Sequence, residues 1–320
     1  MGPITLIVVS NSDIGSTVQG AALLSRDGWR EDESVNGGKV WHHSSSPIHL
    51  WWRDELHLFS NHIDDIYSNS TGFEITEILF LSRHVASSGM PSLTLHPIGV
   101  LGEEPHGSIA EHGGFNGCAV PPSPRFASLF RRLNRIAQKY SLINEFDITL
   151  ETTHHGPLLN TPSLFIEIGS TEEHWGREDA ANVWADVLSE EFELKDSNSI
   201  EPNKPPVMVG IGGGHYAPRH KAVLLQTDAL VGHLLANYSL PMNRPEGDWD
   251  PLTGPLPDGP WKNSIDVAIK QTQESFPHHK VVAHLDRKSF KGWQRQSIRR
   301  YLEEMNVEIF RLADFVNYES

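Results

Sequence analysis

Val207-Met-Val-Gly-Ile-Gly-Gly-Gly-His-Tyr-Ala-Pro218 is a short apolar run that breaks into glycines and then presents His215. This pattern predicts a buried strand that ends in a tight turn. Because open α/β sheets place ligand sites at the ends of their strands, we expect Gly212, Gly213, Gly214 and His215 at a binding site. The run lacks the third glycine of a dinucleotide fingerprint, and no Gly-Lys-Ser/Thr follows to make a phosphate-binding loop. The alternative is a glycine-rich strand end without a chemical role.

The composition is that of an ordinary globular protein, with 38% hydrophobic and 21% charged residues in a chain of 320. Such a length allows one large domain or two intimate ones. Cys118 is the single cysteine, which excludes an intramolecular disulfide and favours a reducing compartment, the cytoplasm or the nucleus. The initial Pro-Ile-Thr-Leu-Ile-Val-Val run predicts a first strand; we expect no membrane segment.

The formal net charge of −15 argues against broad, nonspecific binding of polyanions. Two segments are nevertheless basic. One is a predicted helix with Arg131, Arg132, Arg135 and Lys139; the other carries Arg287, Lys288, Lys291, Arg295, Arg299 and Arg300. Such runs are most often solvated helix faces, and contact with a phosphate backbone is the alternative, favoured slightly in the second segment by Trp293.

Strand-like runs alternate with helical ones along the chain, for example a strand at 163–168 and a helix at 177–192. This order predicts an α/β fold with a mixed or mostly parallel sheet flanked by helices. We expect surface loops at 28–46 and 241–260, because both stretches are polar or rich in proline and glycine. The chain forms either one unit or two closely joined subdomains, residues 1–125 and residues 126–320, the second of which carries a histidine-rich site.

Polar residues recur in or just after the predicted strands: Arg83-His84, His154-His155, Glu167, His215 and His284. If these strands lie side by side, their ends converge on one pocket. Imidazole is the commonest metal ligand and a proton carrier near neutral pH, and the chain has 18 histidines. Glu167 interrupts an apolar strand, so it is either a water-facing residue of an edge strand or a metal ligand or general base.

The segment Arg83-His-Val-Ala-Ser87-Ser88-Gly-Met-Pro contains no serine-nucleophile elbow of the Gly-x-Ser-x-Gly type. Its hydroxyls, guanidinium and amides instead predict binding of an anionic or hydroxyl-rich ligand. We also assign Tyr216 and Lys288 to substrate binding.

Four blocks together resemble the archaeal- and plant-type D-aminoacyl-tRNA deacylases. They are Ser82-Arg-His-Val-Ala-Ser-Ser-Gly-Met-Pro-Ser-Leu-Thr-Leu-His-Pro97, Thr153-His-His-Gly-Pro157, Pro162-Ser-Leu-Phe-Ile-Glu-Ile-Gly-Ser-Thr-Glu172 and Gly210-Ile-Gly-Gly-Gly-His-Tyr-Ala-Pro218. The likeness runs in order over nearly the whole chain. The stretches 28–46 and 241–260 look longer than in the archaeal proteins, which suggests a eukaryotic member.

The resemblance implies hydrolysis of the ester that joins a D-amino acid to the 3′ end of tRNA. It also implies bound zinc, a monomer without an obligate protein partner, and a fold related to phosphorylase/hydrolase-like enzymes. On this reading the zinc ion is held by some of His154, His155, Glu167, His215 and His284. The catalytic residues are His154, His155, Glu167 and His215. The substrate is contacted by Arg83, His84, Ser87, Ser88, the glycine turn, Tyr216 and Lys288.

Two alternatives remain at this point. The same ligands would serve a zinc amidase or carboxypeptidase-like hydrolase acting on small substrates. The glycine turn and the basic helices would serve a noncatalytic protein that binds nucleotides or RNA 3′ ends.

Overall fold

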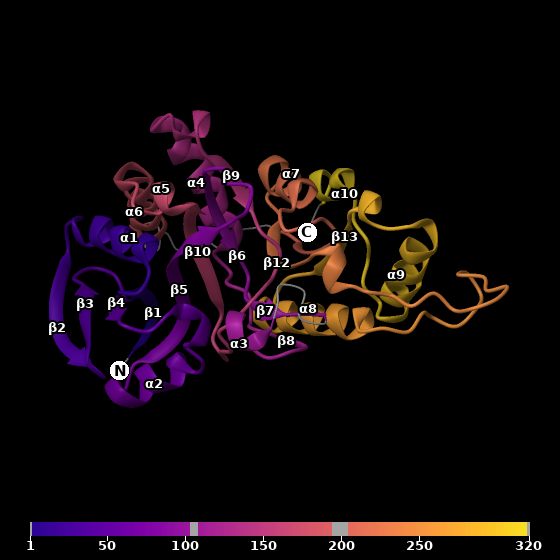
Figure 1. The fold of residues 1–320 in the computed structure, drawn as a ribbon, viewed down its shortest axis with the longest axis horizontal. Coiled ribbons are helices and arrows are strands. Elements are labelled where there is room, and N and C mark those ends of the chain that lie inside the picture. Colours follow the sequence, from indigo (N-terminus) through magenta and orange to yellow (C-terminus); the bar gives the residue numbers. More distant parts are fainter. Residues whose placement is uncertain (1, 103–107, 194–203, 319–320) are drawn as a thin grey trace.

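The computed structural model describes residues 2–102, 108–193 and 204–318 (Figure 1). The predicted α/β fold with a mixed sheet flanked by helices is confirmed. Eight strands form the large sheet in the order β2-β3-β4-β1-β5-β10-β6-β9. Their bounds are β1 Pro3–Ser10, β2 Trp29–Val35, β3 Gly38–His43, β4 Ile48–Arg53, β5 Glu74–Val85, β6 Ser92–His96, β9 Asp147–Leu150 and β10 Ser163–Ser170.

A smaller parallel sheet has the order β12-β11-β13, with β11 at Val207–Ile211, β12 at Leu230–Leu235 and β13 at Val281–Leu285. The short strands β7 (Gly99–Val100) and β8 (Cys118–Ala119) pair with each other. The large sheet takes strands from both sides of residue 125, since β9 and β10 follow that position. The small sheet lies beyond β9 in Figure 1, joined by the Thr153 amide, which donates to the Leu234 carbonyl.

Helices cover these sheets. They are α1 Ile14–Leu24, α2 Ile63–Thr71, α3 Ile109–His112, α4 Phe126–Lys139, α5 Glu172–Trp175, α6 Glu178–Glu193, α7 Pro218–Gln226, α8 Trp261–Ser275, α9 Gly292–Glu304 and α10 Leu312–Val316. The largest apolar core packs α1, α4 and α6 on one face of the large sheet, and α2 packs on the other. A third cluster holds α8 and α9 on the small sheet. Among the described residues, no helix combines the length and apolar character needed to cross a bilayer.

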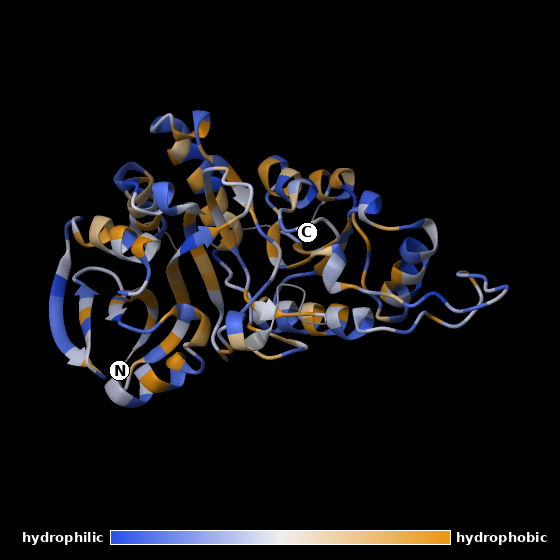
Figure 2. Ribbon diagram, in the orientation of Figure 1, coloured by the Kyte–Doolittle hydropathy of each residue, from blue (hydrophilic) through white to orange (hydrophobic). Residues whose placement is uncertain are grey.

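The prediction of a surface loop at 28–46 is wrong, because this stretch forms the hairpin of β2 and β3. Asn36 and Gly37 both have positive φ, +47° and +80°, as a two-residue hairpin turn requires. β2 is the outer edge of the sheet and is mostly exposed and hydrophilic (Figure 2). The expected loop at 241–260 is confirmed in that no helix or strand lies there.

The basic residues of α4 belong to the packing of the fold. Arg131 donates to the carbonyl oxygens of Leu224, Thr227 and Ala229 near the end of α7. Arg132 pairs with Glu191 at 2.6 Å. These contacts tie α4 to α6 and α7, so this helix is a packed element and its cations are engaged within the protein.

Arg125 should be a strong determinant of stability. Its guanidinium lies 2.5 Å from the buried carboxylate of Glu77 and 3.2 Å from that of Glu191. Arg125→Ala would leave both carboxylates without this cation, so we expect the free energy of unfolding to fall by about 3 kcal/mol in urea titrations. The exposed Arg135→Ala, which removes a surface pair with Glu190, should cost under about 1 kcal/mol. Equal losses in the two variants would contradict this assignment.

Candidate active site

Four strands of the large sheet bring ionisable side chains together on one face. β10 lies between β5 and β6, and β9 lies beyond β6. Glu167 of β10 is level with Ser82 of β5 and Thr94 of β6. Because β6 and β9 run opposite to β5 and β10, the cluster gathers around the middle of β10. It contains His84, His96, Glu151, His154, His155, Glu167 and His215, which we call the histidine cluster.

Two buried carboxylates share the ring of His84. Its Nδ1 lies 3.1 Å from Glu151 Oε1 and 3.3 Å from Glu167 Oε2. Burial alone lowers the pKa of His84, but the two carboxylates outweigh it and raise that pKa to about 9. Burial favours neutral carboxyls, yet the neighbouring imidazoles lower the pKa of both Glu151 and Glu167. At neutral pH the centre therefore holds two carboxylates around an imidazolium. A Cβ at Gly169 would lie 2.7 Å from the Cβ of His84 and 2.8 Å from its ring, so glycine makes room for this histidine.

In three further histidines, Nδ1 contacts a backbone carbonyl and Nε2 is the nitrogen that faces the cluster. Nδ1 of His96 faces the Pro97 carbonyl at 3.0 Å, Nδ1 of His154 faces Thr152 O at 2.7 Å, and Nδ1 of His155 faces Gly156 O at 2.7 Å. A carbonyl only accepts, so each Nδ1 donates and each neutral ring offers its Nε2 lone pair. Ligand atoms of the three rings lie within 4.8 Å of one another. This is an arrangement typical of metal-binding histidines held by backbone carbonyls.

The environment of these three rings favours a cation. His96 Nε2 is buried without a hydrogen-bond partner among the described residues and lies 3.8 Å from Glu167 Oε1. Burial lowers the pKa of His96, but Glu167 outweighs it, and the net shift is upward. Burial and the neighbouring His96 lower the pKa of His155 to about 3, so its ring stays neutral.

The glycine turn after β11 delivers His215 and Tyr216. His215 Nε2 lies 2.7 Å from Glu151 Oε2, and Tyr216 Oη lies 2.8 Å from His84 Nε2. The Thr152 amide donates to the His215 carbonyl at 2.9 Å and fixes the turn against the segment after β9. Burial, reinforced by Glu151, raises the pKa of Tyr216 to about 12, so it keeps its hydroxyl hydrogen.

The three predicted glycines have different surroundings. Gly212 has φ +102°, and a Cβ there would lie 2.8 Å from the Phe290 ring. Gly213 donates its amide to Ser289 Oγ at 2.7 Å. Gly214 alone faces open space. Gly212 therefore serves the turn and its packing on the segment after β13.

The other predicted residues lie at various distances from the centre. Arg83 is half-buried with its guanidinium over the Trp175 ring at 4.9 Å, whereas Ser87 and Ser88 are exposed. Lys288 is exposed on the short helix η5 (Arg287–Ser289). The structure does not bring His284 to the histidine cluster. It lies in the small sheet, where its Nδ1 contacts Nδ1 of His220 at 2.8 Å.

Buried histidines outside the cluster make stability sensitive to acid. Burial lowers the pKa of His57 to about 4 and the pKa values of His220 and His233 to about 3. Between pH 6.5 and about 4 the unfolded chain therefore binds protons that the folded chain does not. We expect the free energy of unfolding to decline as pH falls through this range, and to decline less steeply in His233→Leu, by about 1.4 kcal/mol per pH unit. Urea titrations that give the same stability at pH 7.5 and 4.5 would contradict this.

Two members of the cluster, His96 and Glu151, are absent from the residues selected by sequence. Each follows an apolar run, Ser92-Leu-Thr-Leu in one case and Phe146-Asp-Ile-Thr-Leu in the other. The polar strand end that identified His84 was thus present at both positions. His84 itself was assigned to the substrate, and the structure places it between the carboxylates.

Comparisons with known proteins agree on one family. The sequence model of the D-aminoacyl-tRNA deacylases matches residues 71–310, which include all four blocks noted above. A D-aminoacyl-tRNA deacylase of Arabidopsis thaliana is 41% identical and covers 98% of this chain and 99% of the relative. One from Thermococcus onnurineus is 30% identical, covering 96% and 99%. A crystal structure of a conserved protein of unknown function superposes with a TM-score of 0.76 at 25% identity, covering 98% of this chain and 96% of that one.

Proposed function

The chain belongs to the D-aminoacyl-tRNA deacylase family, and from this premise we propose that it hydrolyses the ester between a D-amino acid and the 3′ end of tRNA. The observation that carries the proposal is the histidine cluster itself. Ester hydrolysis needs an activated water and a donor for the oxygen that becomes negative. Glu151, His84 and Tyr216 lie close enough together to serve both needs.

Glu151 is the proposed acceptor of the proton from water. It is fully buried, and neither carboxylate oxygen has a hydrogen bond of good geometry within the described residues, although His84 and His215 lie within ion-pair distance. The protonated His84 donates Nε2–H to the Tyr216 oxygen, so the Tyr216 hydroxyl can donate to an oxygen of the substrate. His84 returns a proton through this contact when the leaving ribose oxygen needs one.

Zinc fits the Nε2 atoms of His96, His154 and His155, a ligand set known for catalytic zinc. The fit rests on the three Nδ1–carbonyl contacts and on the buried His96 Nε2 that lacks a partner. Bound there, zinc would supply Lewis acidity for water or the ester carbonyl. Glu151 lies beside this set, with its Oε2 3.6 Å from His154 Nε2.

Metal removal tests the zinc proposal. Prolonged dialysis against a chelator should lower the rate of D-aminoacyl-tRNA hydrolysis by at least about tenfold, and stoichiometric zinc should restore it. Elemental analysis should find zinc in the active protein. Full activity in protein that contains no metal would reject the zinc proposal while leaving the deacylase proposal intact.

Competition distinguishes this function from the small-substrate hydrolase. Deacylated tRNA should inhibit the release of D-amino acid from D-aminoacyl-tRNA, because both bind the same surface. Hydrolysis of small amides with no inhibition by deacylated tRNA would instead favour an amidase or carboxypeptidase-like enzyme. Binding of tRNA without turnover would favour the noncatalytic alternative.

Two cations beside the cluster, the exposed Lys288 and the half-buried Arg83, support binding of RNA. Lys288 follows β13. It lies next to the glycine turn that carries His215, since the hydroxyl of the adjacent Ser289 accepts a hydrogen bond from the Gly213 amide. Arg83 precedes His84 directly and lies on the Trp175 ring. We assign both to phosphate or adenosine contacts.

We further propose that the protein acts as a monomer in the cytoplasm or nucleus. Size-exclusion chromatography would check the oligomeric state, and localisation of a tagged protein would check the compartment.

A further inference from the structure

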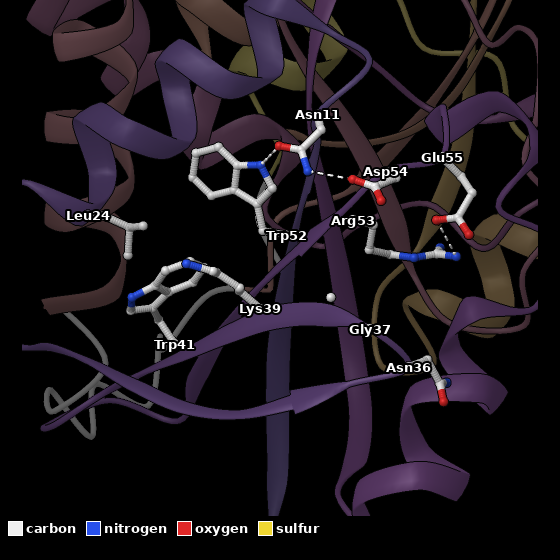
Figure 3. A pocket seen from close by; sticks show the side chains of 11 residues that line it. Asn11, Leu24, Asn36, Gly37, Lys39, Trp41, Trp52, Arg53, Asp54 and Glu55 are labelled. Atoms are coloured by element: carbon white, nitrogen blue, oxygen red, sulfur yellow. Dashed lines mark hydrogen bonds and ion pairs between the residues drawn. The ribbon is translucent and has the colours of Figure 1, made fainter.

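The pocket beside Trp41 and Trp52, about 520 Å³ in volume, lies on the face of the large sheet opposite the histidine cluster (Figure 3). The two tryptophans pack against the core that α1, α4 and α6 form. Phe165, which stacks on the ring of His96, belongs to the core on the other face. This pocket therefore contributes no side chain to the cluster. The side chains that support the cluster come instead from the place where the two sheets meet.

Thr152 and Thr153 lie at that place, between Glu151 and His154 in the chain. Both threonines are buried, and neither has a part in the proposed chemistry. A buried hydroxyl is costly unless it makes hydrogen bonds. The partners of these two hydroxyls therefore indicate what the threonines hold in place.

Thr153 attaches this segment to the small sheet. Its amide donates to the Leu234 carbonyl of β12 at 2.7 Å, and its hydroxyl oxygen accepts the Leu234 amide at 3.1 Å. Burial lowers the pKa of His233 to about 3, so this ring is neutral at pH 7. Its Nδ1 lies 3.0 Å from Thr153 Oγ1 and can accept the hydroxyl hydrogen. The segment is thus fixed on β12 through both the backbone and the side chain of Thr153.

Thr152 attaches the same segment to the glycine turn. Its amide donates to the His215 carbonyl at 2.9 Å. Its hydroxyl lies 3.2 Å from the same carbonyl and 3.3 Å from the Gly214 carbonyl, and because carbonyls only accept, the hydroxyl donates to this pair. The Thr152 carbonyl in turn accepts from Nδ1 of His154 at 2.7 Å. One residue thus contacts both a proposed zinc ligand and the turn that carries His215 and Tyr216.

The glycine turn needs such contacts because its backbone has few constraints of its own. Gly212 has φ +102°, and no atom lies within 4 Å of the place where a Cβ of Gly214 would be. The start of the turn is held by the small sheet, since the Gly212 amide donates to the Leu235 carbonyl at 2.7 Å. The carbonyls of Gly214 and His215 lie farther along, and Thr152 holds them from the side of the histidine cluster.

The position of this turn determines two contacts of the proposed reaction. His215 Nε2 lies 2.7 Å from Glu151 Oε2, and Tyr216 Oη lies 2.8 Å from His84 Nε2. A displacement of about 1 Å between reacting groups can lower a rate on the order of 100-fold. A group that fixes the turn therefore affects the rate without touching the substrate.

We propose that Thr152 is a positioning residue, whose hydroxyl holds the glycine turn in place relative to Glu151 and His84. This inference rests on the proposed function, because it assigns ester hydrolysis to the histidine cluster. Thr152 itself takes part in no bond that forms or breaks. The adjacent Thr153 provides the fixed support, since it anchors the segment on β12.

Removal of the hydroxyl tests this role. Thr152→Val should lower the single-turnover rate of D-aminoacyl-tRNA hydrolysis by roughly 10- to 100-fold, the range for loss of a group that orients catalytic residues. Thr152→Ser keeps the hydroxyl and should stay within about threefold of the wild type. Thr152→Ala should reproduce the loss without placing a methyl group beside the carbonyls, which keeps the test valid if Thr152→Val fails to fold. Wild-type rates in the variants without a hydroxyl, or an equal loss in Thr152→Ser, would overturn the inference.

Thr272→Val is the matched control. Thr272 is also fully buried, and its hydroxyl donates to the Ala268 carbonyl at 2.7 Å within α8, which packs on the small sheet. Both valine variants lose a buried hydroxyl, so urea titrations should show similar losses of the free energy of unfolding. The rate of hydrolysis should change by less than about twofold in Thr272→Val. Equal losses of rate in the two variants would assign the effect to stability and contradict a positioning role.

Hydrogen exchange keeps the inference testable if the wild type hydrolyses no ester. Mass spectrometry should find that the backbone amides of residues 210–217 exchange at least about threefold faster in Thr152→Val than in the wild type or in Thr152→Ser. Thr272→Val should leave this exchange unchanged. Faster exchange in a protein without hydrolysis would reject the proposed function and retain the hold of Thr152 on the turn. Unchanged exchange in both Thr152→Val and Thr152→Ala would reject the inference.

Discussion

Replacing Glu151 with glutamine should reduce kcat for D-aminoacyl-tRNA hydrolysis by roughly 100- to 10,000-fold, the range for loss of a general base. Glutamine keeps the shape of the side chain but cannot accept the proton from water. It also removes one of the two carboxylates that raise the pKa of His84. The pKa of His84 should therefore fall, and the imidazolium form that orients Tyr216 should be less populated. Single-turnover rates with D-aminoacyl-tRNA would measure the effect on the chemical step.

Glu145→Gln is the control for this prediction. Glu145 lies just before β9, six residues ahead of Glu151, but it is exposed and paired with Arg177. Its replacement should change kcat by less than about twofold, as expected for a surface ion pair remote from the site. A fully active, folded Glu151→Gln variant would remove Glu151 from the mechanism.

His154→Ala should abolish activity and bound zinc together. His154 presents Nε2 beside the rings of His96 and His155, and its Nδ1 is fixed by the Thr152 carbonyl at 2.7 Å. Removing one of three proposed ligands should lower zinc affinity by at least about tenfold and the rate of hydrolysis by at least about 100-fold. Elemental analysis and deacylation assays on the same preparation measure both quantities.

His278→Ala should leave both quantities unchanged, because His278 is exposed and lies outside the cluster. Normal circular dichroism in both variants would exclude unfolding as the cause. A His154→Ala protein that keeps its zinc and loses activity would limit His154 to contact with the substrate. Full activity in that variant and in His215→Ala would contradict the assignment of the site.

Local sequence patterns predicted the helices and strands whose own residues carry a clear apolar pattern. The strand expected at 163–168 forms as β10, Ser163–Ser170, and the helix expected at 177–192 forms as α6, Glu178–Glu193. The hairpin at 28–46 was missed because β2 is a charged edge strand without an apolar face, so alternation gave no signal. The Asn36-Gly37 pair was a signal for it, since this dipeptide is typical of two-residue hairpin turns.

The site depended on strand order, which no local pattern contains. Glu167 attracted notice because a carboxylate interrupted an apolar run, but Glu151 came after one and looked like a strand end. Only the order β10-β6-β9 brings the two carboxylates together. His284 shows the reverse case, since its strand end resembles the others but belongs to the small sheet.

The most direct test of the central claim compares hydrolysis of one tRNA charged with the D and the L form of the same amino acid. With wild-type protein, the D ester should be hydrolysed far faster than its spontaneous rate, the L ester should remain, and Glu151→Gln should abolish the difference. Release of neither amino acid, or equal release of both, would contradict the account.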